Sequence, residues 1–271
     1  MMSFVLTRVE EDHLDYFKDL NHIKEVFTKY VEKVPKDGYV VANMKDENIA
    51  SLTQSLDCTV VSYNDDTQLA QKLKKTLHVL GEHNRENAQA AFKVGKILGL
   101  SDDQILKGLS QFKGTWRRQE LVGYRETPRD QQTIPVISDY GHHPTEIKAT
   151  LKAFKEHYPN KRLVVAYQPH QHNRTKKLFK DFVTAFEDAD VLILNEIFDV
   201  AGREETPDQD VSSQDIVAEI IKRDLKTQKS CFYTKTLEDT QKKICTIIQP
   251  DDIVIIMGAG DIDTVARNIV T

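Results

Sequence analysis

The stretch "ISDYGHHPTEIKATL" (137–151) gathers several polar side chains that can bind anions or exchange protons. These side chains are Asp139, Tyr140, His142 and His143. Gly141 permits a tight turn, and Pro144 suits the first turn of a helix. Backbone amides at such a helix start, together with its positive dipole end, receive anions well. The stretch therefore predicts an anion-binding turn between a strand and a helix, with simple capping of the helix as the alternative.

A metal centre is not predicted from these histidines. The side chains of adjacent residues point apart, and no third ligand follows at a spacing typical of zinc sites. The three cysteines, Cys58, Cys231 and Cys245, are odd in number, widely spaced and embedded in apolar patterns. They indicate free thiols in a reducing compartment and no disulfide framework.

Three further polar loops follow apolar runs in the same way. They are "QPHQHNRT" (168–175), "NEIFDVAGREE" (195–205) and "GAGD" (258–261). The carboxyl ends of parallel strands meet at one edge of a sheet, where α/β proteins bind ligands. We therefore expect a ligand cleft at that edge, because four such loops together are unlike ordinary solvated turns.

The second half of the chain alternates near-continuous apolar runs with helical patterns. Strands are expected at 134–140, 162–169, 190–197, 230–234 and 251–260, and helices at 144–158, 174–189, 212–225 and 236–248. Apolar strands separated by helices are typical of a parallel sheet covered on both faces. The pattern predicts a doubly wound, mostly parallel, Rossmann-like α/β domain.

The first half reads as a partial α/β domain. Strands are expected at 3–9, 38–44 and 57–64, and helices at 14–34, 46–56, 84–100 and 102–112, whereas 65–80 fits a helix or an irregular segment. Tyr16, Leu20, Ile23, Val26, Phe27 and Tyr30 form the apolar face of the first helix. Composition shifts at the polar stretch 113–133, so the domains are predicted at 1–113 and 114–271.

Charge and hydropathy exclude several classes of protein. The net charge of −5 and the pI of about 6.0 argue against a nucleic-acid binder. No apolar run approaches the roughly 18 residues of a membrane-spanning helix, and the start, "MMSFVLTRVEEDHLD", does not resemble a secretory signal. A cytoplasmic protein without a membrane or nucleic-acid partner is expected.

Several ordered motifs resemble those of the Mur ligases. They are "GEHNRENAQAA" (81–91), "FKGTWRRQE" (112–120), "SDYGHHPTEIKATL" (138–151), "YQPHQHNRTKKLF" (167–179) and "MGAGDI" (257–262). The segment "DHLDYFKDLNHIKEVFTKYV" (12–31) adds to them. The turn around Gly141, His142 and His143 is named the GHH turn. The "DYGHHPTEI" turn favours the branch that joins L-alanine to UDP-N-acetylmuramate. The resemblance implies the end of a central ATP-binding domain followed by the whole C-terminal domain.

The implied activity is ATP-dependent amide-bond formation through an acyl phosphate, with Mg²⁺, in peptidoglycan synthesis. The sequence contains no G-x-x-x-x-G-K-[ST] loop to hold the ATP phosphates, and it has no UDP-sugar domain. We therefore expect no turnover from this chain alone. Two alternatives stay open: a regulatory module that binds a nucleotide, a muropeptide or a partner protein, and one half of a split ligase completed by a P-loop chain.

The resemblance assigns the nucleotide to two motifs. Asn84 and Asn87 are three residues apart at a helix start, so both amides can face one heterocycle. With His83 beside them, they are implied to hold adenine, and a helix cap by Asn84 is the alternative. A guanidinium binds phosphate oxygens in a bidentate way. Arg118 is implied to be the catalytic arginine and Arg117 a nucleotide contact, the alternative being an exposed basic pair.

The remaining roles come from the resemblance alone. Asp139, Tyr140 and His143 are implied to contact the nucleotide, and His142, His170 and Arg174 the substrate. His13 matches a histidine near the magnesium site of the family and is assigned a catalytic role with it. Gln171 and His172 stand where the family tends to have an arginine and an aromatic residue, which leaves the amino-acid substrate open.

Overall fold

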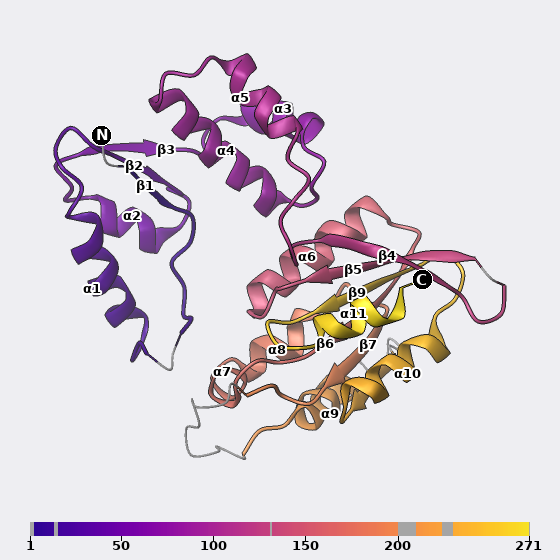
Figure 1. The fold of residues 1–271 in the computed structure, drawn as a ribbon. Helices are drawn as coiled ribbons and strands as arrows, with labels where there is room; N and C mark the ends of the chain where they lie inside the picture. The colour runs from indigo at the N-terminus through magenta and orange to yellow at the C-terminus, as the bar shows by residue number, and fades with distance from the viewer. Residues whose placement is uncertain (1–2, 14–15, 131, 200–209, 224–229, 271) are drawn as a thin grey trace. The chain divides into compact units, whose positions relative to one another are not determined.

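The computed structural model describes residues 3–13, 16–130, 132–199, 210–223 and 230–270 (Figure 1). It contains two compact units, Met1–Lys113 and Gly114–Thr271. No helix in the described ranges is both long enough and apolar enough to cross a membrane.

The N-terminal unit is built on a three-stranded parallel sheet. Its strands are β1 (Ser3–Leu6), β2 (Tyr39–Ala42) and β3 (Thr59–Ser62), in that spatial order. Successive side chains of a strand point to opposite faces. Val40 and Ala42 pack with helices α1 (Leu20–Val31) and α2 (Glu47–Thr53), while Val41 packs with Ala90 of α4 (Glu82–Ile97). The central strand is therefore buried on both faces.

Three helices complete this unit. α3 (Thr67–Thr76) occupies most of the segment left open by the sequence, and Asp66 caps it by accepting from the Leu69 N–H. α5 (Asp102–Ser110) begins, as expected, at Ser101, which forms a capping box with Gln104. α3, α4 and α5 share a small apolar core, which contains Leu69, Leu73, Ala88, Phe92 and Ile105.

Two expected helices differ in the structure. α1 begins at Leu20 because Asp19 caps it through the His22 N–H, so Tyr16 lies before the helix and is 74% exposed. The expected helix 174–189 is divided into α7 (His172–Lys177) and α8 (Phe179–Ala185). The Thr175 hydroxyl donates to the Gln171 carbonyl, a contact that bends helices.

The C-terminal unit contains the predicted doubly wound, mostly parallel sheet. Its strands are β4 (Glu120–Glu126), β5 (Thr133–Asp139), β6 (Arg162–Tyr167), β7 (Val191–Asn195), β8 (Ser230–Thr234) and β9 (Asp252–Met257). The spatial order is β4-β5-β9-β6-β7-β8, and only β4 pairs in the antiparallel sense. Because β9 returns between β5 and β6, the strand order reverses there, which is where such folds bind ligands.

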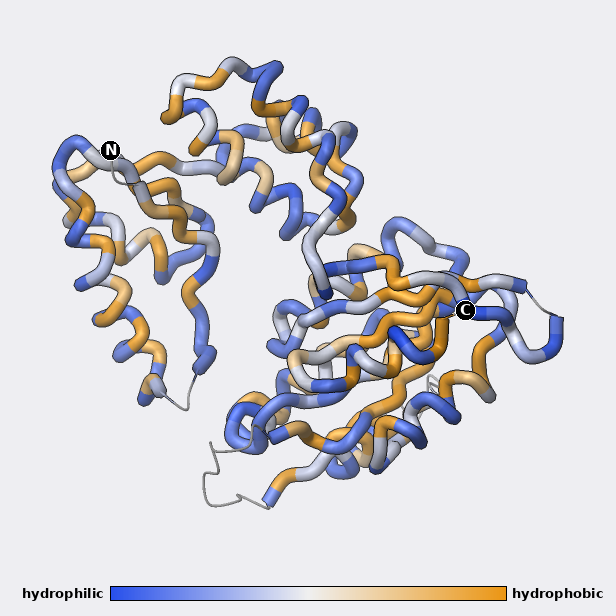
Figure 2. Tube along the Cα trace, viewed as in Figure 1, coloured by the Kyte–Doolittle hydropathy of each residue, from blue (hydrophilic) through white to orange (hydrophobic). Residues whose placement is uncertain are grey.

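Helices cover both faces of this sheet (Figure 1). α6 (Pro144–His157), α8 and α9 (Ser213–Arg223) pack together on one face, and α10 (Leu237–Ile247) and α11 (Asp263–Ile269) on the other. Hydrophobic residues concentrate in the strands between them (Figure 2). The sheet is thus a rigid platform whose loops lie at its two edges.

The packing of α6 generates a stability prediction. Leu151 is 0% exposed, so Leu151→Ala should leave a cavity and lower the free energy of unfolding by about 2–5 kcal/mol. Urea unfolding followed by the fluorescence of Trp116, the only tryptophan, measures this loss in the C-terminal unit. Lys152→Ala, at the exposed neighbouring position, should change it by less than about 0.5 kcal/mol. A loss below about 1 kcal/mol for Leu151→Ala would contradict the described packing.

Candidate functional site

The GHH turn joins β5 to α6 through a capping box. His143 is the N-cap of α6, and its Nδ1 accepts from the Thr145 N–H at 3.3 Å. The Glu146 carboxylate accepts from the N–H groups of His142 (3.0 Å) and His143 (3.3 Å). The imidazole of His143 therefore caps the helix, as the capping alternative expected. Glu146, which the sequence reasoning passed over, organises the turn, and the H-P-T-E spacing was the signal for it.

Asp139 ends β5 and is almost completely buried. Its carboxylate accepts from the N–H groups of Gln119 (2.9 Å) and Gly141 (2.7 Å). Burial raises the pKa of the Asp139 carboxyl, and these two hydrogen bonds oppose that shift. A side chain at position 141 would approach within 2.9 Å of Asp139 Oδ1, so glycine is required there. Asp139 thus ties the segment before β4 to the GHH turn.

Arg117 is buried, with 7% of its surface exposed, and does not belong to an exposed basic pair. Its guanidinium donates to the carbonyl of Gly258 and, at 2.9 Å, to the carbonyl of Gly260. Its Nε lies 3.8 Å from Asp263 Oδ1. All of these contacts hold the turn between β9 and α11. Arg117 therefore supports the glycine turn from inside the unit.

Arg118 lies beside the GHH turn and stays accessible, with 46% of its side chain exposed. Its Nη1 is 3.1 Å from Glu146 Oε1, and its guanidinium carbon is 5.4 Å from the centre of the Tyr140 ring. The two contacts orient the guanidinium without burying it. Of the two adjacent arginines, only Arg118 keeps donors available for an anion from solution.

The charges of the turn compensate each other around Glu146. Burial by itself raises the pKa of the Glu146 carboxyl, but His142 and Arg118 together outweigh it, so the pKa is lowered. Glu146 is therefore ionised at neutral pH. It accepts backbone hydrogen bonds at the helix start and pairs with Arg118 at the same time.

The loop after β6 contributes His170, His172 and Arg174. Arg174 is buried, and its Nη1 lies 3.2 Å from the His170 carbonyl and 3.4 Å from His170 Nδ1. The His170 ring stacks on Phe198, and His172 Nδ1 lies 2.7 Å from Asp199 Oδ2. Arg174 thus orients His170. The expected loop 195–205 lies outside the described residues from position 200 onward.

Gln168 links this loop to the glycine turn and was also missed from the sequence. Its Oε1 accepts from the Ile262 N–H at 3.2 Å, and its Nε2 donates to Asn195 Oδ1 at 3.1 Å. Gly258 has a φ of +147°. A Cβ at Gly258 or Gly260 would clash with the Gln168 backbone or side chain at 2.7 and 2.5 Å, respectively. Close approach to Gln168 explains both glycines.

In the N-terminal unit, His83, Asn84 and Asn87 lie at the start of α4. Gly81, with a φ of 96°, is the N-cap, so the suggested cap by Asn84 is wrong. The Asn84 amide instead donates to the Leu80 carbonyl at 2.7 Å. His83 and Asn84 are half-buried and Asn87 is exposed.

A buried polar cluster follows β2 and β3 in the same unit. The Asn64 amide donates to Asn43 Oδ1, and the Asn43 amide donates to the Thr7 carbonyl at 3.1 Å. Burial, with Glu86 nearby, raises the pKa of Tyr63 to about 12. Burial and then Glu82 raise the pKa of Glu86. The sequence reasoning did not single out these residues, because single asparagines and a tyrosine at strand ends carry no distinctive spacing.

Comparisons with known proteins agree with this arrangement of loops and strands. The model of the Mur ligase glutamate ligase domain matches residues 117–260, and that of the Mur ligase middle domain matches residues 3–78. The chain belongs to the Mur ligase family. The UDP-N-acetylmuramate–L-alanine ligase of Clostridium tetani is 38% identical over 280 residues, which cover 95% of this chain and 58% of that protein. This Mur ligase chain thus spans less than two thirds of that relative.

Solved structures share the fold at low identity. The UDP-N-acetylmuramate–alanine ligase of Thermotoga maritima is 22% identical, with a TM-score of 0.69, over 98% of this chain and 58% of that one. Escherichia coli FolC, solved with DHPP and ADP, is 16% identical, with a TM-score of 0.63, over 98% and 60%. These likenesses support the mostly parallel α/β architecture of both units.

Magnesium, which the family implies, does not fit the residues described here. No group of three or more His, Cys, Asp or Glu side chains in the described ranges could hold a metal ion. His13 is exposed, and its Nε2 lies 3.7 Å from Asp12 Oδ2. In the described residues its side chain pairs with Asp12 and with none of the other candidate residues, so no catalytic step is assigned to His13.

The lowered pKa of Glu146 predicts that its contribution to the free energy of unfolding depends on pH. Glu146→Gln should lower the free energy of unfolding by about 1 kcal/mol at pH 7, because an ionised cap that pairs with Arg118 is lost. The folded-state pKa is lowered from its ordinary value of 4.5, so this contribution is present above 4.5 and is lost as the pH falls through the folded pKa. Urea unfolding should show that the difference in free energy of unfolding between wild type and variant is smaller at about pH 3.5 than at pH 7.

Glu156→Gln provides the matched control on the same helix. Glu156 is exposed, and its ion-pair partner in the described residues is Lys152, so Glu156→Gln should lower the free energy of unfolding by less than about 0.5 kcal/mol at either pH. A Glu146→Gln gap that stays constant from pH 7 to about pH 3.5 would contradict the assigned ionisation.

Proposed function

We propose that these 271 residues are the C-terminal part of an ATP-dependent UDP-N-acetylmuramate–L-alanine ligase. Residues 1–113 would be the end of its central domain and 114–271 its C-terminal domain. The observation that carries the proposal is the accessible guanidinium of Arg118, oriented by Tyr140 and Glu146 at the carboxyl edge of a doubly wound sheet. The identity of 38% to a ligase of this specificity supports the choice of substrates.

Arg118 acts on phosphate oxygens. Transfer of a phosphoryl group to a substrate carboxylate depends on positioning and on neutralising negative charge. An oriented guanidinium supplies charge and paired N–H donors without needing to reorganise. Arg117 acts indirectly, by holding the Gly258–Gly260 turn at the same edge. Magnesium would add further charge neutralisation, but its ligands are not among the described residues.

Adenine recognition belongs to the N-terminal unit. Asn84 and Asn87 offer amide donors and acceptors on the first turns of α4, and His83 lies next to them. Two buried oxygens of this unit, Asn64 Oδ1 and Gln89 Oε1, have no hydrogen-bond partner in the described chain. Unpaired buried acceptors are costly, and the exocyclic amine of adenine is a suitable donor for one of them.

The amino-acid substrate is recognised near His142, His170 and Arg174. Arg174 holds His170 in place, and the His142 backbone carbonyl accepts from the Tyr167 hydroxyl at 3.1 Å. Asp139, Tyr140 and His143 shape the turn on which the nucleotide would lie. His172 stands where the family tends to have an aromatic residue. In this structure it pairs with Asp199.

Nucleotide binding tests the two assigned surfaces separately. Arg118→Ala should weaken Mg-ATP binding about tenfold or more, because a charge-assisted hydrogen bond to phosphate is lost. Asn84→Ala should weaken the binding of both ATP and adenosine, because both contain adenine. Arg118→Ala should leave the binding of adenosine unchanged, because adenosine has no phosphate. Isothermal titration of the purified chain with each ligand measures both effects.

Lys152→Ala is the control, because Lys152 is an exposed cation on α6 outside the candidate site. It should bind both ligands as the wild type does. Equal weakening of ATP by Lys152→Ala and Arg118→Ala would indicate general charge attraction and would reject the role of Arg118.

Turnover requires a phosphate cradle that these 271 residues do not contain. We expect no formation of UDP-N-acetylmuramoyl-L-alanine by the purified chain. We expect product formation once a P-loop segment and a UDP-sugar domain are supplied, in a longer chain or as a second one. A radiolabelled alanine assay measures the product. Turnover by the chain alone that disappears in Arg118→Ala would contradict the need for that cradle, because a contaminating ligase would be unaffected by the substitution.

A further inference from the structure

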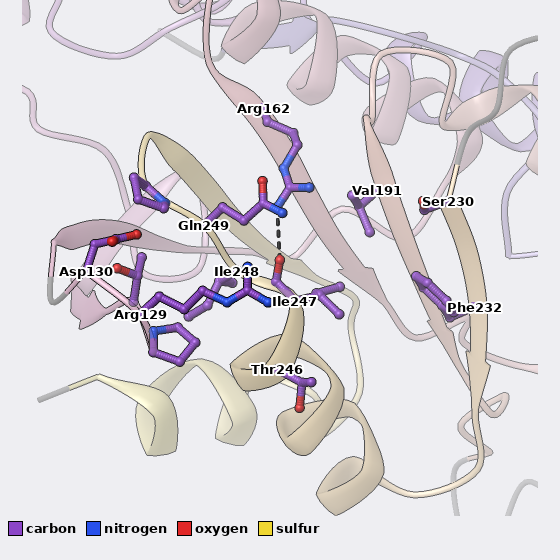
Figure 3. A pocket seen from close by; sticks show the side chains of 13 residues that line it. Arg129, Asp130, Arg162, Val191, Ser230, Phe232, Thr246, Ile247, Ile248 and Gln249 are labelled. Carbon is purple, nitrogen blue, oxygen red and sulfur yellow. Dashed lines mark hydrogen bonds between the residues drawn. The ribbon is translucent and has the colours of Figure 1, made fainter.

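A cavity of about 520 Å³ lies in the C-terminal unit at the amino-terminal edge of its sheet (Figure 3). Arg162 begins β6, Val191 begins β7 and Ser230 begins β8, and all three line the cavity. The candidate ligase residues of this unit lie at the opposite, carboxyl edge. The volume of the cavity falls within the range of roughly 300–1,000 Å³ that is usual for small-molecule sites.

One of the two arginines that line the cavity is held mainly by structural contacts. Arg162 donates from Nε and Nη2 to the two oxygens of Asp252, each at 2.8 Å, and from Nη2 to the Ile247 carbonyl at 2.9 Å. The Asp252 side chain is 1% exposed and that of Arg162 is 32% exposed, so the ion pair is partly buried and its two charges neutralise each other. Arg162 builds the wall and adds no net charge to the cavity.

Arg129 is different. It is exposed, and no hydrogen bond or ion pair joins its guanidinium to another residue in the described part of the chain. In Figure 3 its guanidinium extends toward Ile247 and Ile248, over the interior of the cavity. Its charge and its donors are therefore available to a bound anion.

The opposite wall is apolar. Val191 and Ile248 are buried, and Ile247 and Phe232 are half-buried. Lys243 Nζ lies 3.9 Å from the centre of the Phe232 ring, but Lys243 does not line the cavity. A ligand that fills the cavity would meet apolar surface on one side and a cation on the other.

Thr127 supplies a buried polar group. It lines the cavity and is 2% exposed, and its hydroxyl has no hydrogen-bond partner among the described residues. A buried hydroxyl without a partner is costly, so such groups in native proteins call for an explanation such as a ligand. Asp130 also lines the cavity and is exposed, and its negative charge disfavours ligands with several anionic groups.

We propose that this cavity binds a small organic anion with one acidic group and an apolar body. The acidic group pairs with Arg129 and reaches the Thr127 hydroxyl, while the apolar body packs on Phe232, Val191 and Ile247. The site uses no residue of the candidate ligase site, so it stands or falls independently of the proposed function.

The probe is 8-anilinonaphthalene-1-sulfonate, a fluorescent molecule with one sulfonate and an apolar body. The full chain should bind it saturably, with enhanced and blue-shifted fluorescence. Arg129→Ala should weaken binding about tenfold, because one charge-assisted contact is lost. Phe232→Ala should also weaken it, and circular dichroism verifies that this variant is folded. Octanoate should displace the probe, whereas acetate and octanol at equal concentration should not.

Arg8→Ala is the matched control, because Arg8 is an exposed arginine of the N-terminal unit and does not line the cavity. It should bind the probe as the wild type does. Binding that is absent, that is unchanged by Arg129→Ala, or that falls equally in Arg8→Ala would overturn the proposal.

Discussion

The carboxyl edge of the C-terminal unit depends on one buried guanidinium, that of Arg117. It donates to the carbonyls of Gly258 and Gly260 and so closes the turn after β9, the strand at which the sheet order reverses. The Arg117 carbonyl in turn accepts from the Tyr140 N–H, which joins the same residue to the GHH turn. Arg117, which precedes β4, thereby contacts two turns that are far apart in the sequence, and the Gly258 N–H adds a direct link by donating to the Asp139 carbonyl.

This anchoring explains how adjacent arginines acquire opposite roles. Arg117 and Gln119 both adopt left-handed backbone conformations, with φ of 53° and 52°. Such conformations cost free energy in residues other than glycine and persist only where surrounding contacts compensate for them. Here the compensation comes from the buried Arg117 side chain and from the Asp139 carboxylate, which accepts the Gln119 N–H. The reversal of the backbone leaves Arg118 between them, at the surface beside Tyr140.

The sequence was sufficient for features that rest on local pattern. The apolar runs of β6, β7 and β9 and their intervening helices predicted a parallel sheet, and this placed the histidine loops at one edge. The choice between Arg117 and Arg118 could not come from pattern, because both carry the same side chain and only the left-handed backbone separates them. Gln168 was missed because its partners, Ile262 and Asn195, lie on other loops and strands. Glu146 was missed although the H-P-T-E spacing of its capping box was a local signal. The start of α1 was misplaced because apolar spacing extended past the Asp19 cap.

The two edges of the C-terminal sheet carry the same arrangement of arginines. At each edge one arginine is held by structural contacts: buried Arg117 by the carbonyls of Gly258 and Gly260, and half-buried Arg162 by Asp252 and the Ile247 carbonyl. At each edge a second arginine, Arg118 or Arg129, remains accessible. These two arginines direct their donors at backbone carbonyls and at Asp252, so their main role is to hold the surrounding segments in place. Anion binding therefore falls to the accessible members, and which anion each one takes depends on its neighbours: ionised Glu146 and an aromatic ring at one edge, an apolar wall at the other.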